Sequence, residues 1–429
     1  MKKVLSVLFI LLMSASVYAK KNTRVNDTKN NDTNRSSGSI NFDFELYGLV
    51  YGLTGAQGEY MYDGSHIRIR PGFIMSNSDM KAVMRLEVDQ NFGRGDTTRD
   101  ADPGTDNFAI EVKHAYLETQ ESLLRGLVLM AGLNSYSFPV VFDNDFAMIQ
   151  ASYDLGFCKP LLSLIAIDEF SEVEKTASGV EQDTDLRGYA ADIPFRFGGF
   201  AIRPMIIHLA GGGGSPTASQ GRLTIVGVNL TGDVDFALLK ASGAYMLGDL
   251  EENLGTSAYA FDVELEIKPS EGISIGGFFT FGSGDDGSDP EKNNAFFYNM
   301  NNLFGRITTK TGAPDGRLFL LENATVANSL TGEPASGFDY MDSQLGYMSF
   351  GAYAEAGIGD FTALARFGMA LLVEEDADGN NAIGSEIDLK VSYGIVESTS
   401  VFVEGAYIIA GDVLEENVYQ AAFGMTTEF

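Results

Sequence analysis

The 429-residue sequence contains one cysteine, no tryptophan, few basic residues and, beyond residue 19, no long apolar run. The single cysteine, Cys158, excludes an intrachain disulfide. Lysine and arginine number 29 against 59 acidic residues, and this net charge of −30 argues against nucleic-acid binding, which needs clustered basic groups. No later stretch approaches the roughly 18 consecutive apolar residues of a spanning helix, so a helical membrane protein is excluded. A membrane β-barrel is not excluded, because its signal per segment is weak.

The first 19 residues have the pattern of a secretory signal peptide. Lys2 and Lys3 precede an apolar run from 4 to 13, and Val17 and Ala19 occupy the small-residue positions of a cleavage site. The apolar run is too short for a membrane-spanning helix, which needs about 20 residues. The next segment, 20–38, is rich in Asn, Asp, Thr and Ser, so we expect it to be disordered. The sequence therefore predicts an exported chain whose folded part spans 39–429.

A two-residue alternation of apolar and polar residues is the main structural signal. In "FDVELEIK", residues 261–268, it predicts a β-strand with one apolar face and one charged face. The same pattern occurs at 40–46, 66–70, 80–89 and 385–393. Counting along the chain gives about eighteen such segments, most of them about 10 to 13 residues long. This length suits a tilted strand that crosses a bilayer better than a soluble strand of five or six residues.

The links between these segments alternate between short turns and longer polar stretches. Short turns are expected at 77–79, 121–125, 156–160, 198–199, 231–233, 269–272, 357–360 and 396–399. Longer links are expected at 54–63, 93–107, 136–144, 170–184, 210–220, 248–256, 283–345, 374–383 and 411–416. A transmembrane barrel has this asymmetry between its two ends, whereas a soluble β-sandwich, the alternative, has no reason for it.

We therefore predict an all-β fold, a transmembrane antiparallel up-and-down β-barrel of about 18 strands, with 16 as the main alternative. The uncertainty in the count comes from the segments near 150, 164 and 205, which are poorly patterned. The last of these contains Pro204, which cannot donate a ladder hydrogen bond and predicts an irregularity.

The final segment, "NVYQAAFGMTTEF", resembles the terminal strand of Gram-negative outer-membrane proteins, which ends in an aromatic residue, here Phe429. The stretches at 107–119 and 127–139 are similar to early strands of diffusion porins. This resemblance to the porin superfamily implies a Gram-negative outer-membrane location, with lipid and lipopolysaccharide around the barrel and the barrel-assembly machinery reading Phe429. Many porins are trimers, so a homotrimer is an assembly that the resemblance allows. Porins commonly place Trp in their aromatic girdles, and here Tyr and Phe must serve instead.

In such a barrel the apolar faces meet lipid and the charged faces line the lumen, which selects a set of pore-lining residues. The basic residues expected there are His66, Arg68, Arg70, Lys81 and Arg85. The acidic residues expected there are Asp43, Glu45, Asp262, Glu264, Glu266, Glu355, Glu386, Asp388 and Glu404. We expect a mainly basic wall on the second and third strands, an acidic wall nearly opposite, and a net preference for cations.

No pattern in the sequence predicts catalysis, a metal site or a cofactor. None of the three histidines, His66, His114 and His208, lies in a nucleophile motif, which argues against a hydrolase. The acidic stretch 374–381 departs from an EF-hand because Gly379 precedes the third oxygen ligand, so we interpret it as a solvated loop. Link 283–345 is long enough to be functional, and by analogy with porins it is a candidate to fold into the lumen.

These patterns favour a passive outer-membrane pore for small hydrophilic solutes, with a cation preference. The alternative is a structural or adhesive surface barrel whose lumen is blocked by its own loops. The identity of the solute does not follow from the sequence.

Overall fold

In a computed structural model of the protein, the described residues are 39–55, 60–93, 110–121, 124–138, 140, 142–168, 186–211, 222–251, 254–296, 318, 321, 344–414 and 416–428. The expected signal peptide, the polar segment 20–38 and Phe429 lie outside them. Among the described residues, no helix combines the length and the apolar character needed to cross a membrane.

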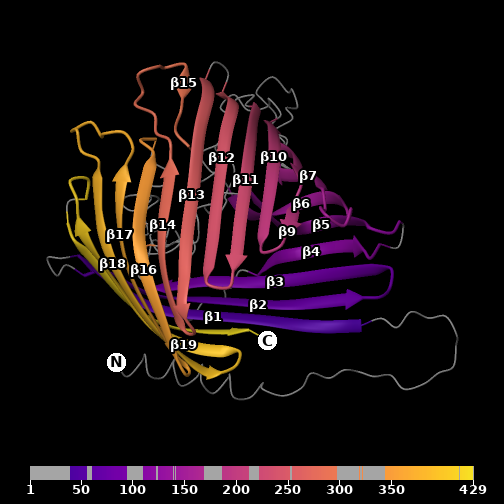
Figure 1. The fold of residues 1–429 in the computed structure, drawn as a ribbon, viewed down its shortest axis with the longest axis horizontal. Helices are drawn as coiled ribbons and strands as arrows, with labels where there is room; N and C mark the ends of the chain where they lie inside the picture. Colours follow the sequence, from indigo (N-terminus) through magenta and orange to yellow (C-terminus); the bar gives the residue numbers. More distant parts are fainter. Residues whose placement is uncertain are drawn as a thin grey trace. The chain divides into compact units, whose positions relative to one another are not determined.

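The alternating segments form twenty β-strands (Figure 1). The first ten are β1 (Ser39–Gly55), β2 (Tyr60–Ser76), β3 (Met80–Gly93), β4 (Glu111–Thr119), β5 (Leu127–Phe138), β6 (Phe142–Tyr153), β7 (Leu161–Asp168), β8 (Leu186–Asp192), β9 (Phe195–Phe197) and β10 (Phe200–Gly211). The others are β11 (Arg222–Val234), β12 (Ala237–Glu251), β13 (Leu254–Ser270), β14 (Ile273–Gly282), β15 (Lys292–Asn293), β16 (Tyr347–Ile358), β17 (Phe361–Leu372), β18 (Ala382–Val396), β19 (Thr399–Ala410) and β20 (Val418–Glu428).

The strands close into one antiparallel barrel. Chain neighbours pair around the ring, and β20 pairs with β1 from Gly55 opposite Val418 to Glu45 opposite Glu428, which removes any free edge. The short strands β8 and β9 both pair with β10 and act as one barrel strand, while β15 is a two-residue strand in a loop that pairs with β13. The barrel therefore has 18 strands, which confirms the main prediction.

The break between β8 and β9 lies beside Pro204. Met205 pairs with Asp192 of β8 and Ile202 pairs with Phe195 of β9, so the unpaired interval faces Arg203 and Pro204. Pro204 has no N–H to donate, although its carbonyl accepts a hydrogen bond from Ile193 N at 3.1 Å. The irregularity that Pro204 predicts therefore lies in the partner strand, between β8 and β9.

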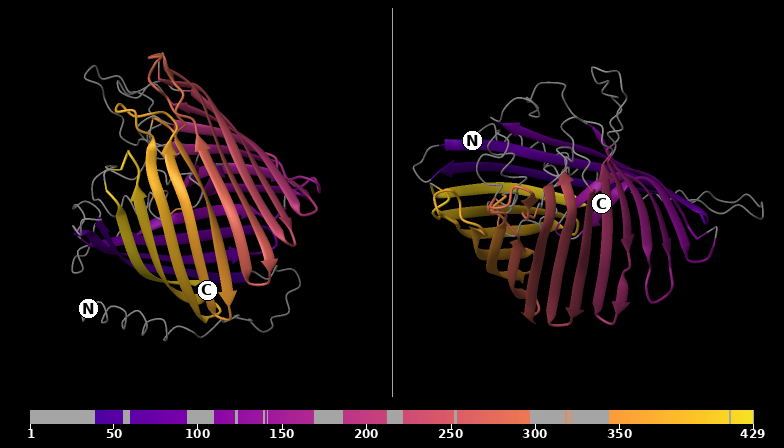
Figure 2. Two further views of the ribbon diagram at one scale, coloured as in Figure 1. Left: turned by 60° about the vertical axis from the view of Figure 1, so that its left-hand side comes forward. Right: turned by 90° about the horizontal axis from the view of Figure 1, so that it is seen from above.

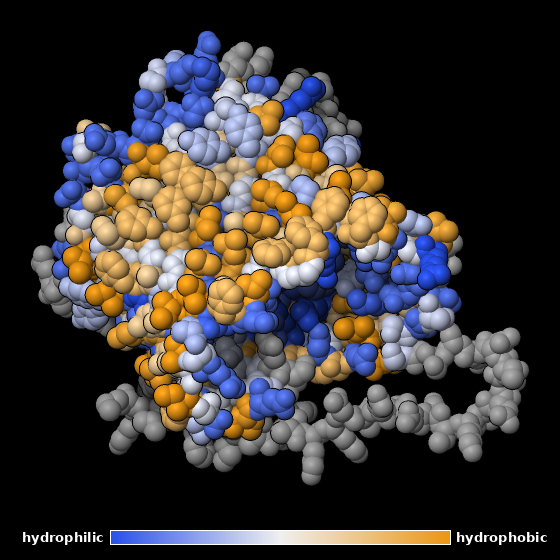
Figure 3. All heavy atoms as spheres, viewed as in Figure 1, coloured by the Kyte–Doolittle hydropathy of each residue, from blue (hydrophilic) through white to orange (hydrophobic). Residues whose placement is uncertain are grey.

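The alternation separates an exposed apolar face from an opposite charged face. In β18, Leu389 is 58% exposed while its neighbour Asp388 is fully buried. In β13, Leu265 is 46% exposed and Asp262 only 5%. Figure 3 shows hydrophobic residues covering the outer face of the strands, with hydrophilic residues gathered toward the strand ends. Aromatic rings stack on this outer face, including Phe261 on Phe279 with ring centroids 5.4 Å apart.

The two ends of the barrel differ in their connections. At one end, which we call the turn end, the strands are joined by short turns, such as 235–236, 271–272, 359–360 and 397–398. The opposite end, which we call the loop end, carries the longer links, which include 283–346 between β14 and β16 and 373–381 between β17 and β18 (Figure 2). Three links expected to be longer are short, because the strands run into them and leave only 56–59, 139–141 and 252–253.

Part of the inner face is apolar, which the sequence pattern did not predict. Buried side chains of β6, β7 and β10 to β13 form one cluster on that face, among them Met148, Ile165, Ile207, Ile225 and Met246. A water-filled lumen would not be lined in this way. Instead, this cluster is covered from inside the barrel by the hairpin that joins β5 and β6.

Candidate pore

The end of the β5–β6 hairpin that contains Phe138 and Phe142 leaves the barrel wall and enters the lumen. β4 and β5 pair only from Ala115 opposite Leu133 to Glu118 opposite Met130, whereas β5 and β6 stay paired up to Phe138 opposite Phe142. Phe138 then packs on the inner face of β11, where its ring would lie 2.7 Å from a Cβ atom at Gly227. Because β5 and β11 are far apart around the ring, the hairpin crosses part of the barrel interior.

The hairpin has two faces with different partners. Tyr136, Phe138, Phe146 and Met148 are each no more than 5% exposed and belong to the apolar cluster. The opposite face carries Asp145, which meets β4. The hairpin therefore buries its apolar face in the cluster, while its polar face narrows the space inside the barrel.

Two described residues of the link between β14 and β16 also lie inside the barrel. Leu318 and Leu321 are at most 1% exposed. The backbone N–H of Leu321 donates to Glu386 Oε2 at 2.8 Å, and the Leu318 side chain would lie 2.7 Å from a Cβ atom at Gly368. Gly368 and Glu386 are register partners on the inner face of β17 and β18. These two residues of the link therefore lie against the inner face of β17 and β18, as the analogy with porins suggests.

Opposite charges alternate across the inner face of β1 to β4 and β6. We call this set the ion-pair wall, and its members are Asp43, Glu45, Arg68, Arg70, Arg85, Glu87, Lys113 and Asp145. Arg70 Nη1 lies 3.2 Å from Glu45 Oε1, and Arg70 Nε also contacts Glu87. Arg85 contacts Asp43. The wall expected to be mainly basic therefore contains paired charges of both signs.

A β-bulge in β4 brings Lys113 into this wall, and His114 lies next to it. The register shifts so that Arg85 pairs with His114 and Leu86 with Val112, which leaves Lys113 as the extra residue. Lys113 Nζ lies 2.6 Å from Asp145 Oδ2 and 3.7 Å from Glu87 Oε1. His114 Nε2 lies 3.4 Å from Asp145 Oδ1. These contacts join β4 to β6 where β4 and β5 are no longer paired.

An acidic group occupies the inner face of β13, half-way round the ring from β3. The Tyr353 hydroxyl of β16 lies 2.8 Å from Glu264 Oε1 and 3.1 Å from Glu266 Oε2, and its single proton donates to one of them at a time. Lys240 Nζ lies 3.6 Å from Glu264, and Lys268 Nζ lies 3.5 Å from Glu266.

The acidic surface continues on the strands that follow. Thr280 donates to Asp262 at 2.8 Å, and Asp388 is the register partner of Arg366. Lys390 Nζ lies 3.2 Å from Glu404 Oε2. We call the set of six carboxylates the acidic wall, and its members are Asp262, Glu264, Glu266, Glu386, Asp388 and Glu404.

The remaining expected pore residues have simpler environments. Lys81 Nζ lies 3.9 Å from Glu118 Oε1, and Glu355 is an exposed residue on the same face of β16 as Tyr353. The backbone of His66 in β2 pairs with Leu49 of β1, and the His66 side chain is not among those described. Sequence reasoning did not select Glu87, although it shares the charged face of β3. The role of Lys113 depends on the bulge, which has no clear signal in the sequence.

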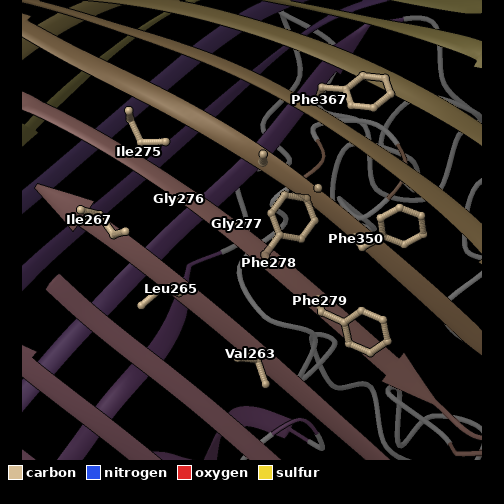
Figure 4. Close-up of a pocket in the computed structure, with 12 residues that line it drawn as sticks. Val263, Leu265, Ile267, Ile275, Gly276, Gly277, Phe278, Phe279, Phe350 and Phe367 are labelled. Atoms are coloured by element: carbon tan, nitrogen blue, oxygen red, sulfur yellow. The ribbon is translucent and has the colours of Figure 1, made fainter. Parts of the chain in front are cut away.

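An apolar groove lies on the outer face, away from these charged groups. It has a volume of about 640 Å³, and its lining comes from β13, β14, β16 and β17. Figure 4 shows Leu265, Ile275, Phe279, Phe350 and Phe367 around it, with Gly277 at its floor. Its lining has no charged side chain, and its position on the apolar exterior fits contact with lipid.

Comparisons with known proteins bear on the fold. No protein-family model matches the sequence, and no curated protein matches it. The structure is similar to that of Acinetobacter baumannii OccAB4, with a TM-score of 0.55 and 11% identity over 93% of this chain and 100% of that chain. It is similar to Pseudomonas aeruginosa OpdK, solved with vanillate, with a TM-score of 0.54 and 10% identity over 91% of this chain and 98% of that chain. For P. aeruginosa OccK11 (OpdR) the TM-score is 0.51 and the identity 11%, over 91% of this chain and 96% of that chain.

These solved structures are outer-membrane porins. At such low identity the likeness concerns the fold, and it extends over nearly the whole barrel. The chain therefore has the fold of an outer-membrane porin, a closed barrel of 18 antiparallel strands.

Proposed function

We propose that the chain forms a passive outer-membrane channel for small hydrophilic solutes, with a preference for cations. The observation that carries this proposal is a closed barrel with an apolar exterior, whose interior presents two charged walls around an inward hairpin. Charged groups on the inner face of a membrane barrel favour a water-filled path. The likeness to outer-membrane porins supports the same function and the same location in a Gram-negative bacterium.

A second candidate is a structural or adhesive barrel with a blocked lumen. The inward hairpin and the buried residues Leu318 and Leu321 favour it, because both occupy space inside the barrel. The two candidates differ in whether a continuous aqueous path remains beside these segments.

The cation preference rests on the acidic wall and on the described loops. In the acidic wall six carboxylates outnumber four neighbouring cations, which are Lys240, Lys268, Lys390 and Arg366, the register partner of Asp388. The loop end adds acidic residues, which are Asp285, Asp286, Asp289, Glu291, Glu374, Glu375, Asp376 and Asp378. A field of one sign at a pore mouth raises the local concentration of counter-ions.

Hydrogen bonds keep several of these loop carboxylates ionised. The Ser288 side chain lowers the pKa of Asp286, and Lys292 lowers the pKa of Asp289. The backbone N–H of Asn380 lowers the pKa of Asp376 below its ordinary value of 3.8. Each group therefore carries its negative charge at neutral pH and in mildly acidic medium.

Single-channel recording in planar bilayers tests the proposal. The purified protein should give stable stepwise openings, and its reversal potential in a KCl gradient should indicate cation preference. The preference should weaken as salt shortens the screening distance below about 8–10 Å. A correctly inserted but silent protein would favour the blocked barrel, and an anion-selective pore would contradict the charge argument.

Paired variants test the acidic wall. Glu264→Gln together with Glu266→Gln should lower the cation preference, because it removes two negative charges beside the path. Lys240→Gln together with Lys268→Gln should raise it, because the same two carboxylates then lose their nearest cations. Equal reversal potentials for both pairs would show that this wall does not face the permeating ions.

A further inference from the structure

One carboxylate of the ion-pair wall, that of Glu87, contacts three basic side chains. Its Oε2 lies 3.8 Å from Arg68 Nε and also contacts Arg70 Nε. Its Oε1 lies 3.7 Å from Lys113 Nζ. Glu87 is only 4% exposed, so these cations surround a buried anion.

Three separate features of the sequence bring the cations together. Arg68 and Arg70 are two residues apart in β2 and therefore point to the same face. Lys113 reaches that face because of the bulge in β4. The register of β2 with β3 places Ile69 opposite Val88, which brings Glu87 between the two arginines and the lysine.

The arrangement matches what an anionic ligand requires. Guanidinium groups bind carboxylate and phosphate oxygens with directed, charge-assisted hydrogen bonds, and an ammonium group adds a point charge. A buried carboxylate in turn needs such partners, because an unpaired buried charge is very costly. Glu45 neutralises part of the positive charge of Arg70, and Asp145 neutralises part of that of Lys113.

We propose that Glu87 is an internal anion that occupies an anion-binding site on the pore wall. This inference rests on the proposed channel function and names a determinant of its selectivity. The side chain holds the position that the carboxylate or phosphate group of a solute would take between Arg68, Arg70 and Lys113. Because the site is filled by the chain itself, anions find no unpaired cluster of cations there, and the wall does not oppose the passage of cations.

Glu87→Gln tests this role with almost no change of shape. It should lower the cation-to-anion permeability ratio roughly three- to ten-fold, the effect expected when one charge about 10 Å from the permeating ions acts with opposite sign on cation and anion, at dielectric constants at or somewhat below that of water. It should also create a site for citrate, which would block the current in a concentration-dependent manner. Wild type should resist the same citrate concentration, and Glu87→Asp should keep most of the wild-type behaviour.

Glu118→Gln is the matched control. It removes the same charge from the neighbouring strand, but among the described residues Glu118 contacts a single basic side chain, that of Lys81, at 3.9 Å. It should shift selectivity less than Glu87→Gln and should not produce citrate block. Equal shifts in the two variants, or no citrate block in a Glu87→Gln pore that opens normally, would overturn the proposal.

The lysine side of the site gives a second, independent readout. Lys113→Gln should raise cation preference by more than Lys81→Gln does, and it should reduce the effect of Glu87→Gln in the double variant. This arm decides the matter if Glu87→Gln alone fails to assemble, which heat-dependent migration in gel electrophoresis would reveal. Absence of openings in wild type would instead refute the channel function itself, so the two failures are distinguishable.

Discussion

At the scale of single residues, a glycine and a tyrosine organise the acidic wall. Tyr353 of β16 reaches the carboxylates of β13 by crossing the inner face of β14 at Gly276. An added Cβ atom at Gly276 would lie 2.3 Å from the tyrosine ring, so only glycine leaves room for the ring. The ring in turn covers backbone that has no side chain of its own, in the way that aromatic residues shield glycines in other sheets.

Gly276→Ala should therefore destabilise the barrel by about 1–3 kcal/mol, because the ring of Tyr353 must move. The next residue provides the control, since Gly277 faces the outer groove and an added Cβ atom would have its nearest neighbour at 3.4 Å. Thermal unfolding of both variants in detergent measures the difference. Similar losses in the two variants would show that the ring does not depend on this gap.

At this scale the alternation predicts which way a side chain points but not which partner it finds. The exposed position of Leu265 and the inward position of Glu266 follow from a period of two. The pairing of Arg70 with Glu45 and Glu87 depends on strand register, which the alternation alone does not give. The alternation therefore predicts a mainly basic wall, whereas the structure has basic and acidic side chains in pairs.

At the scale of elements, the β5–β6 hairpin explains why some strands lack clear alternation. The inner face of β7 contains Ile165 and that of β10 contains Ile207. Both side chains are buried in the apolar cluster to which the hairpin contributes Phe138 and Met148. A strand that is buried on one face and in contact with lipid on the other carries apolar residues on both. The weak patterning near 164 and 205 was thus a sign of a second, internal layer.

Phe138→Ala should loosen the hairpin and widen the pore. The ring fills the space over Gly227, and losing a buried Phe side chain costs about 3–5 kcal/mol in a packed core. Single-channel records should show a larger and noisier conductance than wild type. Phe350→Ala is the control, because that ring is 40% exposed on the outer face. Unchanged conductance in Phe138→Ala would mean that the hairpin does not limit the path.

At the scale of the whole molecule, the two ends of the barrel should face different compartments. In a Cys158→Ser background, Ala377→Cys on the loop end should react with a membrane-impermeant maleimide on intact cells. Ser78→Cys on the turn end should react only after the outer membrane is broken, because short turns of such barrels face the periplasm. Labelling of Ser78→Cys on intact cells would reverse the orientation.

The global architecture was the part most open to prediction. The strand count follows from counting alternating segments, and closure follows because a free edge has no hydrogen-bond partners in lipid. The inward path of the hairpin does not follow, since the alternation predicts only a link between two strands at 136–144, and the contact of Phe138 with β11 depends on the curvature of the closed barrel.

The contact of Phe138 with Gly227 also bears on the order in which the barrel assembles. β5 enters the sheet early in the chain, whereas its partner on the inner face belongs to β11, so the contact joins segments that are distant in sequence. Such contacts form late, because the intervening chain must first be ordered. During assembly the apolar side of the hairpin therefore stays uncovered until the middle strands have joined the sheet. We therefore expect the hairpin to dock inside the barrel only after β11 has joined the sheet.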